Sequence, residues 1–164
     1  MGLDRYLKLS GFLNRLGYEI DLSTLESRIS LQKRAYFAQL LGLSLDYSFG
    51  WYVFGPYSTE LTREVYQFQG IESFVRPNEG DNEERARVFF GEVNALVTIN
   101  KDGSYWLELL SSLHFLAMRA VPHLTDMEQC FSKLLAEKPG KFNREDMETA
   151  WNLLVKNELL PLTG

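Results

Sequence analysis

The stretch that decides the fold reads Phe-Gly-Trp-Tyr-Val-Phe-Gly-Pro-Tyr and covers residues 49–57. Five of its nine residues are aromatic, two are glycine and one is proline. In an extended chain Phe49, Trp51 and Val53 share one face, and further rings lie on the other face. Because both faces carry rings, we expect the stretch to be a buried connector between helix layers. A recognition surface for a partner is the alternative interpretation.

A short β element is expected around residues 47–54, because aromatic and β-branched side chains dominate there. This extended segment forms one arm of a hairpin in our interpretation. The Gly55-Pro56 pair is expected to break it, since the residue before a proline is pushed out of the helical region. Ser58 is then in position to cap a new helix, with Glu60 in the favourable first turn.

The rest of the chain predicts helices, because apolar residues recur at three- and four-residue spacing between glycine and proline stops. About seven helices are expected, around residues 9–16, 23–41, 58–68, 83–97, 105–121, 125–135 and 147–154. The segment 105–121 is apolar on most sides, which predicts a central buried helix. Two pairs with capping-box spacing, Ser23 with Glu26 and Thr125 with Glu128, predict helix starts.

Length and composition are typical of one globular domain that covers residues 1–164. Apolar residues make up 45% of the chain and charged residues 24%, which is enough for one sizeable core. Residues 76–82 contain Pro77 and Gly80 and are interpreted as a loop, with a hinge between two subdomains as an option. The predicted fold class is therefore a mostly α, compact helical domain with a short β element, and a winged-helix-like core is one arrangement of it.

The balance of charge disfavours a general nucleic-acid coat. The formal net charge is −5, whereas such a coat needs an excess of cations to neutralise phosphates. Arg28, Lys33 and Arg34 form the densest basic cluster. We interpret this cluster as a solvated helix face, and a nucleic-acid contact is the alternative.

Few residues point to chemistry. The two histidines, His114 and His123, and the one cysteine, Cys130, fit no metal-ligand spacing, and no phosphate-binding glycine motif occurs. Cys130 lies on the apolar stripe of its helix, which indicates burial rather than reactivity. We expect no cofactor and no enzymatic activity, with a hydrolase that uses one of the histidines as a third hypothesis. A single cysteine, no signal peptide and no long apolar run predict a cytoplasmic protein without membrane contact.

One set of residues combines a helix motif with a turn motif at a fixed separation. These motif residues are Leu31, Gln32, Lys33, Tyr36, Trp51, Phe54, Gly55, Pro56 and Tyr57. Their order resembles the pattern of the YwgA-like proteins and, more distantly, the Panacea domains of phage-associated and SocA-like antitoxins. The resemblance covers about a quarter of the chain.

The resemblance implies a compact helical fold with a short β element, and work directed at a partner. Panacea domains are associated with neutralising toxins, and SocA with delivering a toxin to a protease. Many Panacea members have tyrosine where this chain has Phe54, so a hydrogen bond from that hydroxyl is absent here. We expect the motif to be mainly scaffold, in which Gln32 and Lys33 bind carbonyls of the turn.

Our leading hypothesis is a non-enzymatic protein-interaction module, antitoxin-like or adaptor-like, whose partner is a toxin, a protease or a second copy of the chain. The alternative is a DNA-binding regulator with a winged-helix-like core. In that hypothesis the helix with Arg28, Lys33 and Arg34 is the reader, and the hairpin with Trp51 is the wing. The sequence leaves open the partner's identity, the oligomeric state and the pathway.

Overall fold

The computed structural model describes residues 2–71, 83–120, 124 and 126–161, and it confirms the mostly helical fold with a short β element. Seven helices and one two-stranded sheet occur in the described residues. In chain order they are α1 (Leu3–Arg15), α2 (Leu25–Leu40), β1 (Gly50–Tyr52), β2 (Gly55–Tyr57), α3 (Thr59–Phe68), α4 (Glu83–Ala95), α5 (Gly103–Met118), α6 (Met127–Glu137) and α7 (Arg144–Lys156). The predicted hinge at 76–82 lies outside the described residues.

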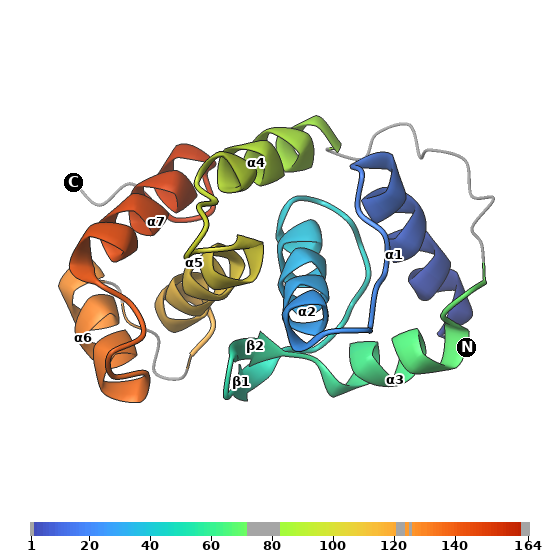
Figure 1. Cartoon of the computed structure of the whole chain (residues 1–164), viewed down its shortest axis with the longest axis horizontal. Coiled ribbons are helices and arrows are strands. Elements are labelled where there is room, and N and C mark those ends of the chain that lie inside the picture. The colour runs from blue at the N-terminus through green and yellow to red at the C-terminus, as the bar shows by residue number, and fades with distance from the viewer. Residues whose placement is uncertain (1, 72–82, 121–123, 125, 162–164) are drawn as a thin grey trace.

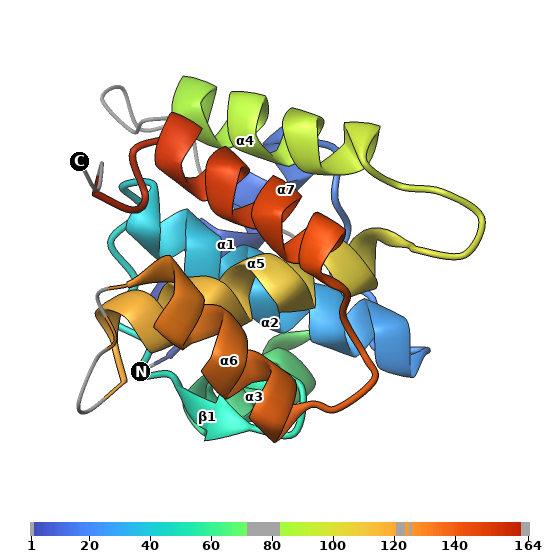
Figure 2. The ribbon, with the colours of Figure 1, turned by 90° about the vertical axis from the view of Figure 1, so that its left-hand side faces the viewer.

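Helices α2 and α5 lie side by side in the middle of the molecule (Figure 1). Helices α1 and α3 flank α2 on one side, and α6 and α7 flank α5 on the other (Figure 1). Helix α4 runs beside α7 in both views, and Lys156 Nζ joins the two at 2.6 Å from Glu92 Oε2 (Figures 1 and 2). Buried side chains from all seven of these helices form one apolar core.

Helix α5 is the predicted central helix, and the structure confirms its burial. Every residue of its span from 106 to 117 is buried. An apolar helix surrounded by other helices needs no polar face, and the polar side chains that it does carry must therefore find partners inside. Glu108 and His114 have such partners, whereas the buried Ser112 Oγ has no hydrogen-bond partner among the described residues.

The helix starts confirm one predicted cap and correct two others. Ser58 Oγ accepts a hydrogen bond from Leu61 N at 3.2 Å, as expected for the cap of α3. The expected pairing of Ser23 with Glu26 is wrong, because Thr24 Oγ1 accepts from Ser27 N at 3.0 Å and caps α2 instead. Asp126 caps α6, and Thr125 lies outside the described residues.

The two strands form an antiparallel hairpin with Trp51 opposite Pro56 and Tyr52 opposite Gly55. The Gly55-Pro56 pair, expected to break the β element, is instead its second strand. Proline is tolerated there because a strand in a two-stranded sheet always has an edge whose N–H groups need no sheet partner. Gly55 has a φ of +90°, and a Cβ on it would lie 2.5 Å from Ser112 Oγ. Only glycine fits this close approach to α5.

None of the described helices combines the length and apolar character that crossing a membrane requires.

Candidate binding groove

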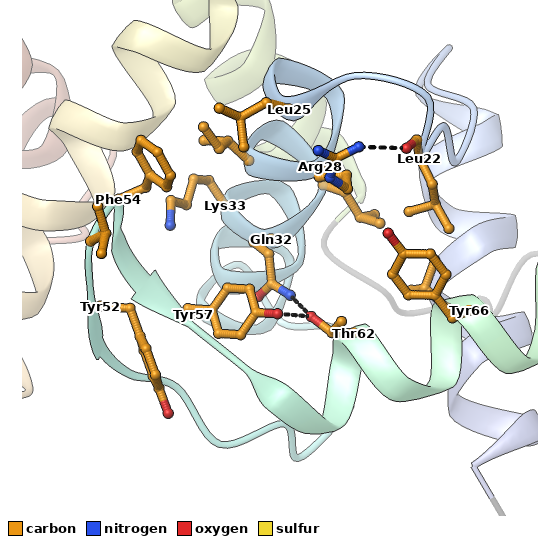
Figure 3. Close-up of a pocket in the computed structure, with 14 residues that line it drawn as sticks. Leu22, Leu25, Arg28, Gln32, Lys33, Tyr52, Phe54, Tyr57, Thr62 and Tyr66 are labelled. Carbon is orange, nitrogen blue, oxygen red and sulfur yellow. Dashed lines mark hydrogen bonds between the residues drawn. The ribbon is translucent and has the colours of Figure 1, made fainter.

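A groove opens between α2, the hairpin and α3, with a volume of about 360 Å³. Its walls are mainly apolar and aromatic, and fourteen residues line it (Figure 3). One wall comes from the first half of α2, the second from the hairpin and the third from α3. Concave apolar sites of this size are the usual form of ligand and peptide sites in proteins.

The rim of the groove is an exposed apolar surface. Four large hydrophobic residues form it: Val53 is 79% exposed, Tyr66 51%, Tyr52 49% and Leu25 45%. Single exposed hydrophobics are common on protein surfaces, but a contiguous group around a cavity marks an interaction site. These four residues come from α2, the hairpin and α3, so the fold itself assembles them.

The rim corrects our interpretation of residues 49–57 as a connector covered on both faces. Phe49 packs against the core, with its ring centroid 5.2 Å from that of Tyr36. Trp51 is only partly buried and lies 5.6 Å from the ring of Phe115. The side chains of Tyr52 and Val53, at the tip of the hairpin, are largely exposed. The stretch is therefore a structural connector at its base and an exposed surface at its tip.

Gln32 fastens the end of the hairpin to α2. Its Oε1 accepts from Ser58 N at 2.8 Å, and its Nε2 donates to Ser58 O at 3.1 Å and to Thr62 Oγ1 at 2.8 Å (Figure 3 draws the Thr62 bond). An amide that pairs with both backbone groups of one residue fixes the direction of the chain at that point. The expected binding of Gln32 to a carbonyl of the Gly55-Pro56 turn is corrected in its partner, because the carbonyl belongs to Ser58 at the start of α3.

Lys33 lies on the floor of the groove with its side chain 1% exposed. Its Nζ donates to Pro56 O at 2.5 Å, which confirms the expected contact with the turn. Burial lowers the pKa of this amine to about 7, Glu108 raises it in part, and Lys138 and Lys141 lower it further. The predicted solvated face is therefore wrong for Lys33, because α2 turns this position toward the hairpin.

Glu108 on α5 is the buried acid behind the hairpin. Its carboxylate oxygens lie 3.0 Å from Lys138 Nζ and 2.7 Å from Lys141 Nζ. Lys138 Nζ also donates to Val53 O, so a second buried lysine binds the hairpin backbone. Lys33 and Lys138 thus bind the hairpin carbonyls of Pro56 and Val53, and Glu108 is the counter-ion of Lys138 and Lys141 and a nearby negative charge for Lys33.

The other two members of the basic cluster are engaged in different places. Arg28 lines the groove, and its Nη1 donates to Leu22 O at 2.8 Å (Figure 3). Arg34 stacks on Tyr18, with its guanidinium carbon 3.9 Å from the ring centroid. Lys33 is buried, and Arg28 and Arg34 line different cavities, so the three cations do not share an exposed face. A nucleic-acid contact stays a prediction that rests on Arg28 and Arg34.

His114 is a buried structural residue. Its Nδ1 lies 2.6 Å from Tyr36 Oη, and its ring also bonds to the backbone of Leu159. Burial lowers the pKa of His114 to about 4, with Arg119 as a second cause, so the ring is neutral at pH 7 and Nδ1 accepts from Tyr36. A hydrolase hypothesis needs a histidine that lines a cavity. His114 lines neither of the two described cavities, so it does not support that hypothesis. His123 lies outside the described residues.

Cys130 is fully buried, as its position on the helix stripe predicted. Burial raises the pKa of its thiol to about 11, so the thiolate required for nucleophilic attack is scarce at neutral pH. Among the described residues no cluster of three or more histidine, cysteine, aspartate and glutamate side chains is arranged to hold a metal ion.

A second cavity of about 280 Å³ lies on the other side of α2. Its polar lining includes four carboxylates and one cation, namely Glu19, Asp21, Glu26, Asp102 and Arg34. Asp21 accepts from Ser23 N and from Ser27 Oγ, and Asp102 caps α5. Two of these carboxylates therefore have structural roles.

The structure brings five of the nine motif residues to the groove: Leu31, Gln32, Lys33, Phe54 and Tyr57. Gly55 and Pro56 form the strand beside it, whereas Tyr36 and Trp51 do not line it. Sequence reasoning missed the rim residues Leu25 and Tyr66. Tyr66 follows the buried Val65 directly and therefore lies off the apolar stripe of α3. A large aromatic residue off that stripe was the available sequence signal for an exposed apolar surface.

No protein-family model matches this chain, and neither a curated protein nor a solved structure is significantly similar to it.

Proposed function

We propose that this protein is a non-enzymatic interaction module that binds an apolar segment of another protein in the groove between α2, the hairpin and α3. The observation that carries the proposal is the continuity of the apolar groove with its exposed rim of Leu25, Tyr52, Val53 and Tyr66. Binding would remove this surface from water, which is the main driving force of such association.

The shape of the site supports a peptide-sized occupant. Helices and extended segments of partner proteins commonly dock their apolar faces into grooves between secondary-structure elements. The two aromatic rim residues, Tyr52 and Tyr66, are of the type that contributes most at protein interfaces. A toxin, a protease or a second copy of the chain is the class of partner that the resemblance to YwgA-like and Panacea proteins adds to this proposal.

A capture experiment with matched variants tests the proposal. Val53→Asp and Tyr66→Ser each alter the rim from a different element, and Ile99→Asp places the same new charge on a fully exposed apolar residue away from the groove. We expect the wild type and Ile99→Asp to retain the same partner from a native extract. Both rim variants should lose it, because a charge or a lost ring at the rim opposes apolar burial.

Equal recovery of that partner by Val53→Asp and by the wild type would contradict the proposal. A melting curve for each variant shows that the fold is intact, so lost capture is not confused with unfolding.

A further inference from the structure

The groove carries a charge that contrasts with the rest of the chain. The protein has a formal net charge of −5, yet the groove's lining includes two cations, Arg28 and Lys33, and no carboxylate from the described part of the chain. The two cations lie toward opposite ends of the groove, Lys33 beside Phe54 and Arg28 beside Tyr66 (Figure 3). An apolar site with only positive groups is electrostatically complementary to an occupant that carries negative charge.

Lys33 has the geometry of a buried anchor for an anion. An ammonium has three N–H donors, and within the described residues Lys33 donates one hydrogen bond, to Pro56 O. Two donors therefore remain for an acceptor in the groove. Gln32 fixes the backbone at Ser58, and the nearby Pro56 carbonyl accepts from the Lys33 amine. The amine is therefore held in place before any occupant arrives.

We propose that the occupant is an apolar peptide segment of the partner that carries one acidic side chain, whose carboxylate pairs with Lys33 on the floor of the groove. This inference rests on the proposed function and adds the chemistry of the segment. A peptide is favoured over a small apolar acid, because the apolar surface extends from the groove onto rim residues that are 45% to 79% exposed. A small acid would leave that rim in water.

The charges around Lys33 give the pairing a pH dependence. Glu108 on α5 stabilises the ammonium, while Lys138 and Lys141, which follow α6, oppose it together with burial. Arg28 is the further cation of the groove. The pKa of Lys33 in the free protein is about 7, so the cation is present below that pH and is lost above it. A peptide carboxylate stays ionised over this range, so binding that depends on the pair should weaken as the pH rises.

A randomised peptide library displayed on phage tests the inference with the full chain as bait. Selection is run in parallel on the wild type, on Val53→Asp and on Lys33→Met, which keeps the length of the side chain and removes its charge. We expect the wild type to enrich apolar peptides with one acidic residue. Lys33→Met should enrich apolar peptides without that acid, and Val53→Asp should enrich neither.

The best wild-type peptide is then compared with its Glu-to-Gln version by titration calorimetry. At about pH 6 the glutamine version should bind about ten- to a hundredfold more weakly, as expected for loss of a charged hydrogen bond. At about pH 9 the two peptides should bind almost equally, because Lys33 is then neutral. This comparison on the wild type holds even if Lys33→Met folds poorly.

Each other outcome overturns a different claim. Enriched peptides without acidic residues, or a Glu-to-Gln difference that does not change with pH, would overturn the role of Lys33 and leave the proposed function standing. No enrichment on the wild type beyond that on Val53→Asp would overturn the proposed function itself. Decanoate that binds the groove more tightly than every selected peptide would show that a small acid is the occupant.

Discussion

The base and the tip of one short hairpin differ sharply in how they are held. On the side that faces the core, here called the base, Lys33 and Lys138 bind the backbone carbonyls of Pro56 and, in the hairpin turn, of Val53, and Gln32 pairs with both backbone groups of Ser58. At the tip, the side chains of Tyr52 and Val53 are largely exposed. The comparison shows that the fold uses buried polar contacts to fix the backbone of a segment whose apolar side chains remain free.

Such an arrangement suits recognition. Exposed apolar side chains on a mobile loop must be ordered when a partner binds, and that ordering costs free energy. A hairpin whose carbonyls are bound from α2 and from the residues after α6 presents its side chains already in position. Changes at the base should therefore reduce the stability of the whole domain, and changes at the tip should reduce binding alone.

The largest loss of stability is expected for Glu108→Gln at the base. The variant leaves Lys138 buried without its counter-ion, and loss of one partner of a buried ion pair costs about 3–5 kcal/mol. Urea denaturation measures the change in the free energy of unfolding. Glu128→Gln is the control, because Glu128 pairs with Arg144 at the surface and its loss should change stability little. Similar small effects of both variants would show that Glu108 does not stabilise the hairpin base.

A somewhat smaller loss is expected for Gly55→Ala. The positive φ of +90° strains any residue with a Cβ, and the new atom would lie 2.5 Å from Ser112 Oγ. Together these effects should cost about 2–4 kcal/mol in the free energy of unfolding. Gly17→Ala separates them, because Gly17 has a φ of +91° with nothing within 4 Å of its Cβ position. If both variants lose the same stability, the close approach of the hairpin to α5 contributes nothing.

Trp51→Ala tests the boundary between base and tip. Trp51 is partly buried and packs on Phe115, so we expect a loss of about 2–3 kcal/mol, below the range for a fully buried tryptophan. A thermal melt measures it, and Trp51→Phe is the control that retains a ring. An unchanged melting temperature together with lost capture of the partner would place Trp51 with the tip, as a surface anchor.

The sequence predicted the helices well because apolar spacing reports burial of a helix face directly. The central burial of α5 and the cap at Ser58 followed from such local patterns. The second strand was missed, because proline usually argues against a strand and the two-stranded sheet that tolerates Pro56 is not visible from spacing.

The groove was predictable only in part. The motif identified Gln32 and Lys33, and the expectation that they bind carbonyls of the turn was correct for Lys33, whereas Gln32 binds the carbonyl of Ser58 just beyond it. Their neighbours Tyr66 and Leu25 were not identified, because which face of α2 meets α3 depends on tertiary packing. The buried partnership of Glu108 with Lys138 joins residues thirty positions apart on different elements, and no local pattern encodes such a distance.

The ionisation of Lys33 should change the free energy of unfolding with pH, by less than the substitutions above. Its pKa is about 7 in the folded protein and near the ordinary value of 10.5 in the unfolded chain, so the unfolded state binds more protons between these values. Stability should therefore rise with pH across this window, by about 2 kcal/mol between about pH 7 and about pH 9. Parallel urea titrations of Lys33→Met should lack this rise. A rise of equal size in both proteins would assign it to other groups.

The smallest change in stability is expected for Val53→Asp at the tip. Its side chain is 79% exposed, and the carbonyl that Lys138 binds belongs to the backbone, which the substitution leaves in place. The free energy of unfolding should change by less than about 0.5 kcal/mol, and Ile99→Asp should match it. Capture of the partner should nevertheless be lost only in Val53→Asp. A stability loss as large as that of Gly55→Ala would show instead that tip and base form one structural unit, and the exposed rim would then no longer be a surface reserved for binding.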